Sequence, residues 1–167
     1  MPRNDAPLLM IAAGTGIAPF RGFIRTRIAL RLAGKTLGPA TLLFGCQNEH
    51  GELCHEVVEK ALAVGAISRY EVAYSRSTKS PKQYVQHKLR ETPDIFTDLI
   101  GTHSGHVFIC GDASMAVGVQ DTVCDVLNDT NIVHRLKSQE RWHEDIFGSP
   151  LTALKSIESE QRSKEDK

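Results

Sequence analysis

The stretch LLMIAAGTGIAPFRGFIRTR, residues 8–27, constrains the fold more than any other part of the chain. The residues from Pro7 to Ala12 are all apolar, as expected for a strand that is covered on both faces. A Gly-Thr-Gly turn follows, and Pro19 stands near the first turn of a helix, where its missing N–H costs little. The stretch therefore predicts a buried strand, a tight turn and a helix.

The same alternation of strand and helix patterns continues along the chain. Further strand-like runs are ATLLFGC at 40–46, RYEVAYS at 69–75, HVFICG at 106–111 and RWHEDIFG at 141–148. Apolar residues at helical spacing occupy 20–28, 53–62, 84–90 and 115–127. Repeated strand–helix units predict an α/β fold, a Rossmann-like parallel five-stranded sheet with helices on both faces. Ligands of such folds bind outside the carboxyl ends of the strands.

Length and charge limit the class of protein. A chain of 167 residues is long enough for one domain with a substantial core. We expect residues 1–148 to form this domain and the polar residues 149–167 to be a flexible tail. The net charge of zero argues against bulk binding of nucleic acid. No apolar run approaches a membrane span and no signal peptide is evident, so we expect a cytoplasmic chain without a membrane segment.

The turn Gly14-Thr15-Gly16 is a candidate phosphate site. Glycines let the backbone approach a ligand closely, and a helix N-terminus offers free N–H groups and a favourable dipole. The turn does not have the GxGxxG pattern of dinucleotide-binding folds. A tight strand-to-helix turn without a ligand is the alternative interpretation.

A second candidate site begins at the last residue of the strand-like run at 69–75. Ser75, Arg76 and Lys82 place a hydroxyl, a guanidinium and an ammonium near Tyr84. These groups suit a phosphate dianion such as the 2′-phosphate of NADP(H), which NAD(H) lacks. The alternative is a basic surface loop.

Three further residue patterns bear on chemistry. Cys110 ends a strand-like run and is either a small buried residue or a neighbour of a reacting nicotinamide, with Asp112 close enough to interact. His143, Glu144 and Asp145 are adjacent, but consecutive residues of a strand alternate faces. The four cysteines lack metal-ligand spacing and are expected to be reduced thiols. We therefore predict no metal site.

Five blocks occur in an order that resembles a known family: GTGIAPFRGF, LLFGC, AYSR, KQYVQHKL and VFICGDASMA. Together they resemble the NADP-binding domain of the ferredoxin-NADP reductase-like flavoproteins, and more closely the diflavin reductases. The ending RWHEDIFG with a polar tail is similar to the reductase end of nitric oxide synthase. An NADPH–cytochrome or sulfite reductase is the alternative within the same family.

The resemblance implies roles for these residues at the two ends of NADP(H). The turn would contact the pyrophosphate and the nicotinamide end through Gly14, Thr15 and Gly16. The adenosine 2′-phosphate end would be held by Ser75, Arg76, Lys82, Tyr84 and Gln86.

The resemblance also implies which residues lie at the nicotinamide end of the cofactor and which domains are partners. Cys110 and Asp145 would flank the nicotinamide and tune hydride transfer, and Phe147 would stack on FAD. The function implied is hydride transfer from NADPH to FAD, with electrons passed on to FMN and haem in the parent enzyme. The FAD and FMN domains would be partners, and calmodulin could act on the parent. Alone, the chain is expected to bind NADPH without turnover. A stand-alone, non-catalytic NADP(H)-binding module is the alternative.

Two positions and one segment depart from the family pattern. Gln47 follows Cys46 where the family usually carries Arg, and Gly118 stands where the family has an acidic residue. Two of the family's contacts to the cofactor are therefore not expected here. The segment between Leu127 and Arg141 is shorter than in the synthases, so the sequence does not define the last helix or its packing.

Overall fold

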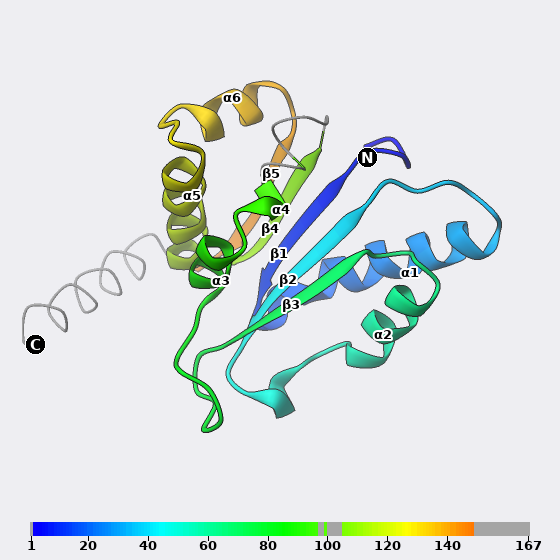
Figure 1. The fold of residues 1–167 in the computed structure, drawn as a ribbon, viewed down its shortest axis with the longest axis horizontal. Helices are drawn as coiled ribbons and strands as arrows, with labels where there is room; N and C mark the ends of the chain where they lie inside the picture. The colour runs from blue at the N-terminus through cyan, green and yellow to red at the C-terminus, as the bar shows by residue number, and fades with distance from the viewer. Residues whose placement is uncertain (1, 97–98, 100–104, 149–167) are drawn as a thin grey trace, which may run out of the picture.

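A five-stranded sheet forms the centre of the molecule (Figure 1). Its strands are β1 (Leu8–Ala13), β2 (Ala40–Cys46), β3 (Arg69–Tyr74), β4 (His106–Asp112) and β5 (Trp142–Phe147). Every pairing is parallel, and the order is β3-β2-β1-β4-β5. The computed structural model describes residues 2–96, 99 and 105–148. Within them it confirms the predicted parallel five-stranded sheet, whereas the predicted tail at 149–167 lies outside the described residues.

Helices cover both faces of this sheet (Figure 1). One face carries α1 (Ala18–Leu32) and α2 (His55–Ala63), and the other carries α3 (Val85–Glu91), α4 (Asp94–Phe96), α5 (Ala113–Leu127) and α6 (Ile132–Ser138). Two 3-10 turns, η1 (Gly14–Ile17) and η2 (Glu49–Gly51), follow β1 and β2. From β1 the chain adds β2 and β3 toward one edge of the sheet, and it then crosses back to place β4 on the other side of β1. The carboxyl ends of β1 and β4 therefore form the topological switch point, where ligands of such folds bind.

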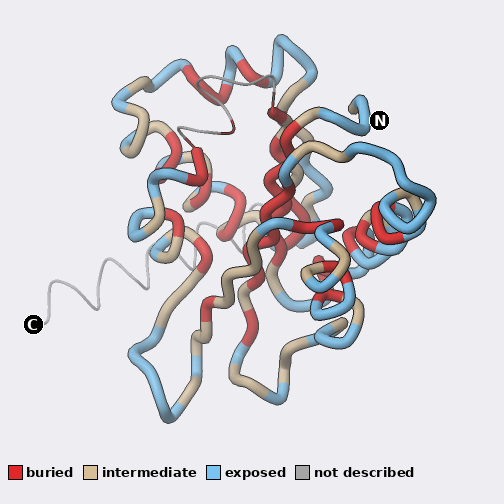
Figure 2. The backbone as a smooth tube through the Cα atoms, turned by 45° about the vertical axis from the view of Figure 1, so that its right-hand side comes forward, coloured by how far each residue is buried: buried red, intermediate tan, exposed pale blue. Residues whose placement is uncertain are grey.

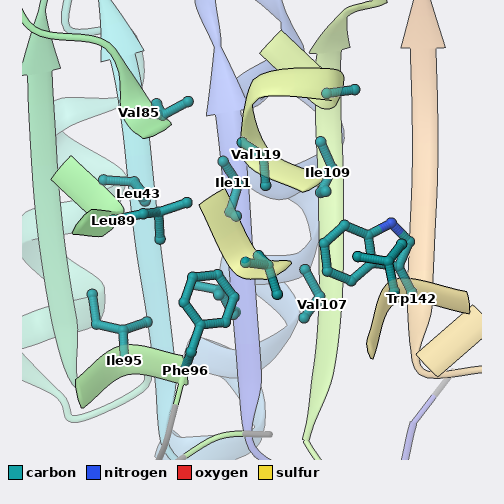
Figure 3. Packing of buried hydrophobic residues seen from close by; sticks show 14 of the residues in the cluster. Ile11, Leu43, Val85, Leu89, Ile95, Phe96, Val107, Ile109, Val119 and Trp142 are labelled. Carbon is teal, nitrogen blue, oxygen red and sulfur yellow. The ribbon is translucent and has the colours of Figure 1, made fainter. Parts of the chain in front are cut away.

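Alternation along the buried strands divides the core into two layers. Leu9 and Ile11 of β1 pack under α3 and α5, where Figure 3 shows Leu89 and Val119 directed at the sheet. Met10 faces the opposite way, toward α1 and α2. Buried residues concentrate in the strands and on the inner sides of the helices (Figure 2). A strand buried on both faces reads as a continuous apolar run, which is why β1 was predictable.

The structure corrects one boundary of the sequence interpretation and shows what forms in a segment that the interpretation left open. The helix predicted from Leu53 begins at His55, and Leu53 is 46% exposed. The segment after Leu127 contains α6, which buries Leu136 with two neighbouring apolar residues. Phe147, at the end of β5, is 46% exposed.

Two global features follow from the described residues. No helix in residues 2–96 or 105–148 is long and apolar enough to cross a membrane. All four cysteines are free thiols, as predicted.

Candidate functional site

A cavity of about 940 Å³ opens at the carboxyl ends of β1 to β4. The turn after β1 contributes Gly14 and Thr15, and the segment after β3 contributes Ser75 and Tyr84. The remaining walls come from the loop after β2, from α3 and from the start of α5. The structure thus brings the two candidate phosphate sites of the sequence into one cavity.

The turn after β1 is built to pass close to β4. Gly14 has a φ of +55°, a conformation that favours glycine. Gly16 is buried, and a Cβ at this position would lie 2.7 Å from the carbonyl carbon of Cys110 and closer still to its oxygen. Neither η1 nor α1 has an acidic residue in its first turn. The turn therefore suits an anion, because no carboxylate opposes the positive end of the helix dipole.

The segment after β3 presents its polar groups on a fixed backbone. The backbone N–H of Ser75 donates to the Cys46 carbonyl at 2.9 Å, and its Oγ lies 3.3 Å from the same oxygen. Tyr84 is the N-cap residue of α3, and the Nζ of Lys82 lies 4.9 Å from the centre of its ring. Ser75 and Tyr84 line the cavity, whereas Arg76 and Lys82 lie on the exposed part of the segment beside it.

The loop after β2 forms a wall of the cavity and is tied to β3. Glu52 accepts hydrogen bonds from the hydroxyls of Tyr74 and Tyr70, the latter at 3.3 Å. Burial, and then the Glu52 carboxylate, raise the pKa of Tyr70 above its usual range, so the phenol remains a donor. The Oγ of Ser77 donates to Glu49 at 2.9 Å. These contacts hold the loop against the segment that carries Ser75.

Asp112 lies at the junction of β4 and α5 and also lines the cavity. Its Oδ1 accepts the backbone N–H of Met115 at 3.0 Å and the hydroxyl of Ser114 at 2.5 Å. This is the arrangement of a helix N-cap. The predicted cofactor residue thus has a structural role in α5, and its remaining carboxylate oxygen stays available to a ligand.

The predicted catalytic residues are brought together on neighbouring strands. Cys110 and Asp145 are register partners in β4 and β5, with Sγ and Oδ2 4.0 Å apart. Burial, and secondarily Asp145, raise the pKa of the Cys110 thiol, which keeps it protonated near neutral pH. Phe147 lies two residues beyond Asp145, on the same strand face, and is half exposed. None of these three residues lines the cavity, but Cys110 lies close to it, because it packs on Gly16, which directly follows the lining residue Thr15.

The cavity is also lined by residues that the sequence interpretation did not identify. Polar members are Asn48, His50, Gln83, His87, Arg90, Asp121 and Thr122. On α3, Arg90 stands four residues after Gln86 and three after His87, and this helical spacing is the one sequence signal that could have indicated Arg90. Gln47, the residue at the position of the family's Arg, accepts the backbone N–H of Arg76 through its carbonyl at 2.7 Å. Among the described residues no group of three or more His, Cys, Asp or Glu side chains is placed to hold a metal ion.

The fold and the position of the cavity are those of a Rossmann-like nucleotide-binding domain. The model of the oxidoreductase NAD-binding domain family matches residues 10–121, and the chain belongs to this family.

Individual relatives of the chain are nitric oxide synthase-like proteins and NADPH–cytochrome P450 reductases. The chain is 37% identical to a nitric oxide synthase-like protein of Bombyx mori, over 88% of this chain and 14% of that protein. It is 34% identical to an NADPH–cytochrome P450 reductase of Drosophila melanogaster, over 87% of this chain and 23% of that protein. It is 41% identical to a bifunctional cytochrome P450/NADPH–P450 reductase of Bacillus subtilis, over 74% of this chain and 12% of that protein. The chain therefore spans less than a quarter of the length of these relatives.

Proposed function

We propose that the chain binds NADP(H) in the cavity at the switch point, as the NADPH-binding part of a flavoprotein reductase. The observation that carries this proposal is the single cavity that joins the turn at Gly14 and Thr15 to Ser75 and Tyr84. Its volume, about 940 Å³, falls in the range of cofactor sites. The relatives named for NADPH make the phosphorylated dinucleotide the first candidate.

The residues of the cavity fit the parts of this dinucleotide. The turn supplies backbone N–H groups and a favourable dipole for the diphosphate. Ser75, Arg76, Lys82 and Tyr84 would hold the 2′-phosphate, with Gln86 beside them. Arg76 and Lys82 are exposed, and we propose that they close over the phosphate from the rim.

The pair Cys110 and Asp145 would act at the nicotinamide end. Hydride chemistry itself is supplied by NADPH and a flavin when these are bound. The raised pKa of Cys110 would keep a neutral thiol next to the nicotinamide, and Asp145 places a carboxylate oxygen 4.0 Å from that thiol. Phe147 would cover the flavin ring, which explains why a large aromatic side chain is left half exposed.

The length of the relatives supports a larger parent protein. We propose that FAD and FMN domains are the partners of this domain and that electrons pass from FAD to FMN and on to haem. A synthase-like parent, on which calmodulin acts, is the preferred form, and an NADPH–cytochrome reductase type is the alternative. We further propose a cytoplasmic location and expect residues 1–148 to act as the NADP(H)-binding unit.

The proposal is tested by calorimetric titration of the chain with NADP⁺ and NAD⁺. We expect NADP⁺ to bind about 10- to 100-fold more tightly, the worth of charge-assisted contacts to one phosphate. Arg76→Ala should remove most of this preference and leave the affinity for NAD⁺ unchanged. Arg25→Ala, on the exposed side of α1 and beyond its first turn, is the matched control and should change neither affinity. Equal affinity of the wild type for both dinucleotides would contradict the assignment of the 2′-phosphate site.

A further inference from the structure

The cavity extends between α3 and α5, beyond the positions of the phosphate sites. Gln86 and Arg90 of α3 line it on one side, and Gly118 and Thr122 of α5 line it on the other. The two helices lie side by side on the same face of the sheet (Figure 1). Arg90 joins α3 to α5 through an ion pair of 2.8 Å with Asp125. We use the name α3–α5 groove for the part of the cavity that these four lining residues bound.

The side chain of Gln86 packs against α5 at Gly118, which is the one glycine among the α5 residues that line the cavity. A Cβ at Gly118 would lie 3.1 Å from Nε2, 3.2 Å from Cδ and 3.4 Å from Cγ of Gln86. The backbone of Gly118 is helical, so its conformation does not require glycine. The absence of a Cβ is therefore what makes room for the amide of Gln86.

This position of Gln86 is poor in hydrogen bonds. Among the described residues, only two buried side-chain N or O atoms have no partner, Oε1 of Gln86 and Oγ1 of Thr122. Thr122 lies one helical turn after Gly118, on the same side of α5, yet the two atoms are not bonded to each other. A buried acceptor without a donor raises the free energy of the state that contains it. The amide is thus held by packing in a place where its oxygen is unsatisfied.

We propose that Gln86 is stowed in the α3–α5 groove against Gly118 and leaves this position when the dinucleotide binds. The released amide then hydrogen-bonds the phosphorylated ribose beside Tyr84, the N-cap residue two positions earlier. This inference rests on the proposed function, because the ligand that draws Gln86 out is the adenosine end of NADP(H). Gly118 consequently lowers the affinity for the cofactor, since only the fraction of molecules with Gln86 released is ready to bind.

A mutant cycle tests the stowed position. The probe is adenosine 2′,5′-bisphosphate, titrated by calorimetry into the wild type, Gly118→Ala, Gln86→Ala and the double variant. Gly118→Ala crowds the stowed amide and should raise the affinity about three- to tenfold if the released form is a minority. In the Gln86→Ala background the same substitution should change the affinity by less than about twofold, because no amide remains to be released. Gly22→Ala, in α1 with open space around it, controls for the helix-forming effect of alanine.

A spectroscopic readout separates this proposal from the function on which it rests. The side-chain NH₂ signals of Gln86 are identified by their loss in Gln86→Ala. They should move when the probe is added to the wild type and should be moved already in ligand-free Gly118→Ala. Unchanged signals in Gly118→Ala, or the same gain in affinity in both backgrounds, would overturn the stowed position alone. Failure of the probe to bind the wild type would overturn the proposed function, and the release of Gln86 by a ligand with it.

Discussion

Gly16→Ala is expected to destabilise the protein because the turn after β1 touches the backbone of β4. The new Cβ would lie 2.7 Å from the carbonyl carbon of Cys110. The carbonyl oxygen of Cys110 would be closer still, so the two segments would have to separate by more than about 0.7 Å to reach the 3.4 Å of ordinary van der Waals contact. Neither partner is a flexible side chain, so a main-chain shift is required. We expect a loss of about 3 kcal/mol in the free energy of unfolding, at the upper end of the cost of overpacking.

Gly22→Ala is the matched control for this prediction. Gly22 lies six residues further on, inside α1, and a Cβ there would have no atom within 4 Å. Alanine is the better helix former, so this variant should gain about 0.5–1 kcal/mol. Urea unfolding followed by circular dichroism measures both variants against the wild type. Equal stability of Gly16→Ala and the wild type would refute the argument that this turn is packed against β4.

Two further predictions concern the core and the response to pH. Arg27 is 5% exposed and donates to the carbonyls of Ala66 at 2.8 Å and Gly38 at 2.5 Å. Arg27→Met should therefore lower the free energy of unfolding, measured in urea, by about 2–4 kcal/mol. A loss below about 0.5 kcal/mol would contradict this prediction. His106 and His143 have ring nitrogens 3.3 Å apart, and burial lowers the pKa of both, so protonation favours the unfolded chain. Stability should be complete above the unfolded pKa of about 6.5 and fall as the pH drops below it. Urea unfolding at pH 7.5 and 5 measures this slope, which His143→Phe should reduce; an unchanged slope in the variant would contradict the assignment.

The fold was largely predictable because its central strands β1 and β2 are buried on both faces. A continuous apolar run such as that of β1 is typical of a strand that helices cover on both faces, and the alternation of such runs with helical patterns favours the parallel architecture. Helix α6 was difficult to predict from the sequence because it has seven residues and its apolar positions stand among polar ones. Its stability comes from burying Leu136 against the sheet, which is a tertiary effect.

The site was predictable where it lies at the ends of strands and unpredictable where it depends on packing. Gly14 and Ser75 follow strand-like runs, and parallel strands bring such residues to one edge. The contact of Gln86 with Gly118 depends on how α3 and α5 pack, which residue spacing does not encode. The pairing of Cys110 with Asp145 likewise depends on the register of β5, which the sequence alone does not define.

The central claim is that the cavity at the switch point binds NADP⁺ with its 2′-phosphate at the end of β3. The most direct measurement is an NMR titration of ¹⁵N-labelled protein with NADP⁺, with NAD⁺ in parallel. We predict that NADP⁺ shifts the amide signals of Gly14, Thr15, Ser75 and Arg76, and that only the signals of the last two depend on the 2′-phosphate. Shifts confined to residues outside the cavity, or identical shifts of Ser75 and Arg76 with both dinucleotides, would contradict the account.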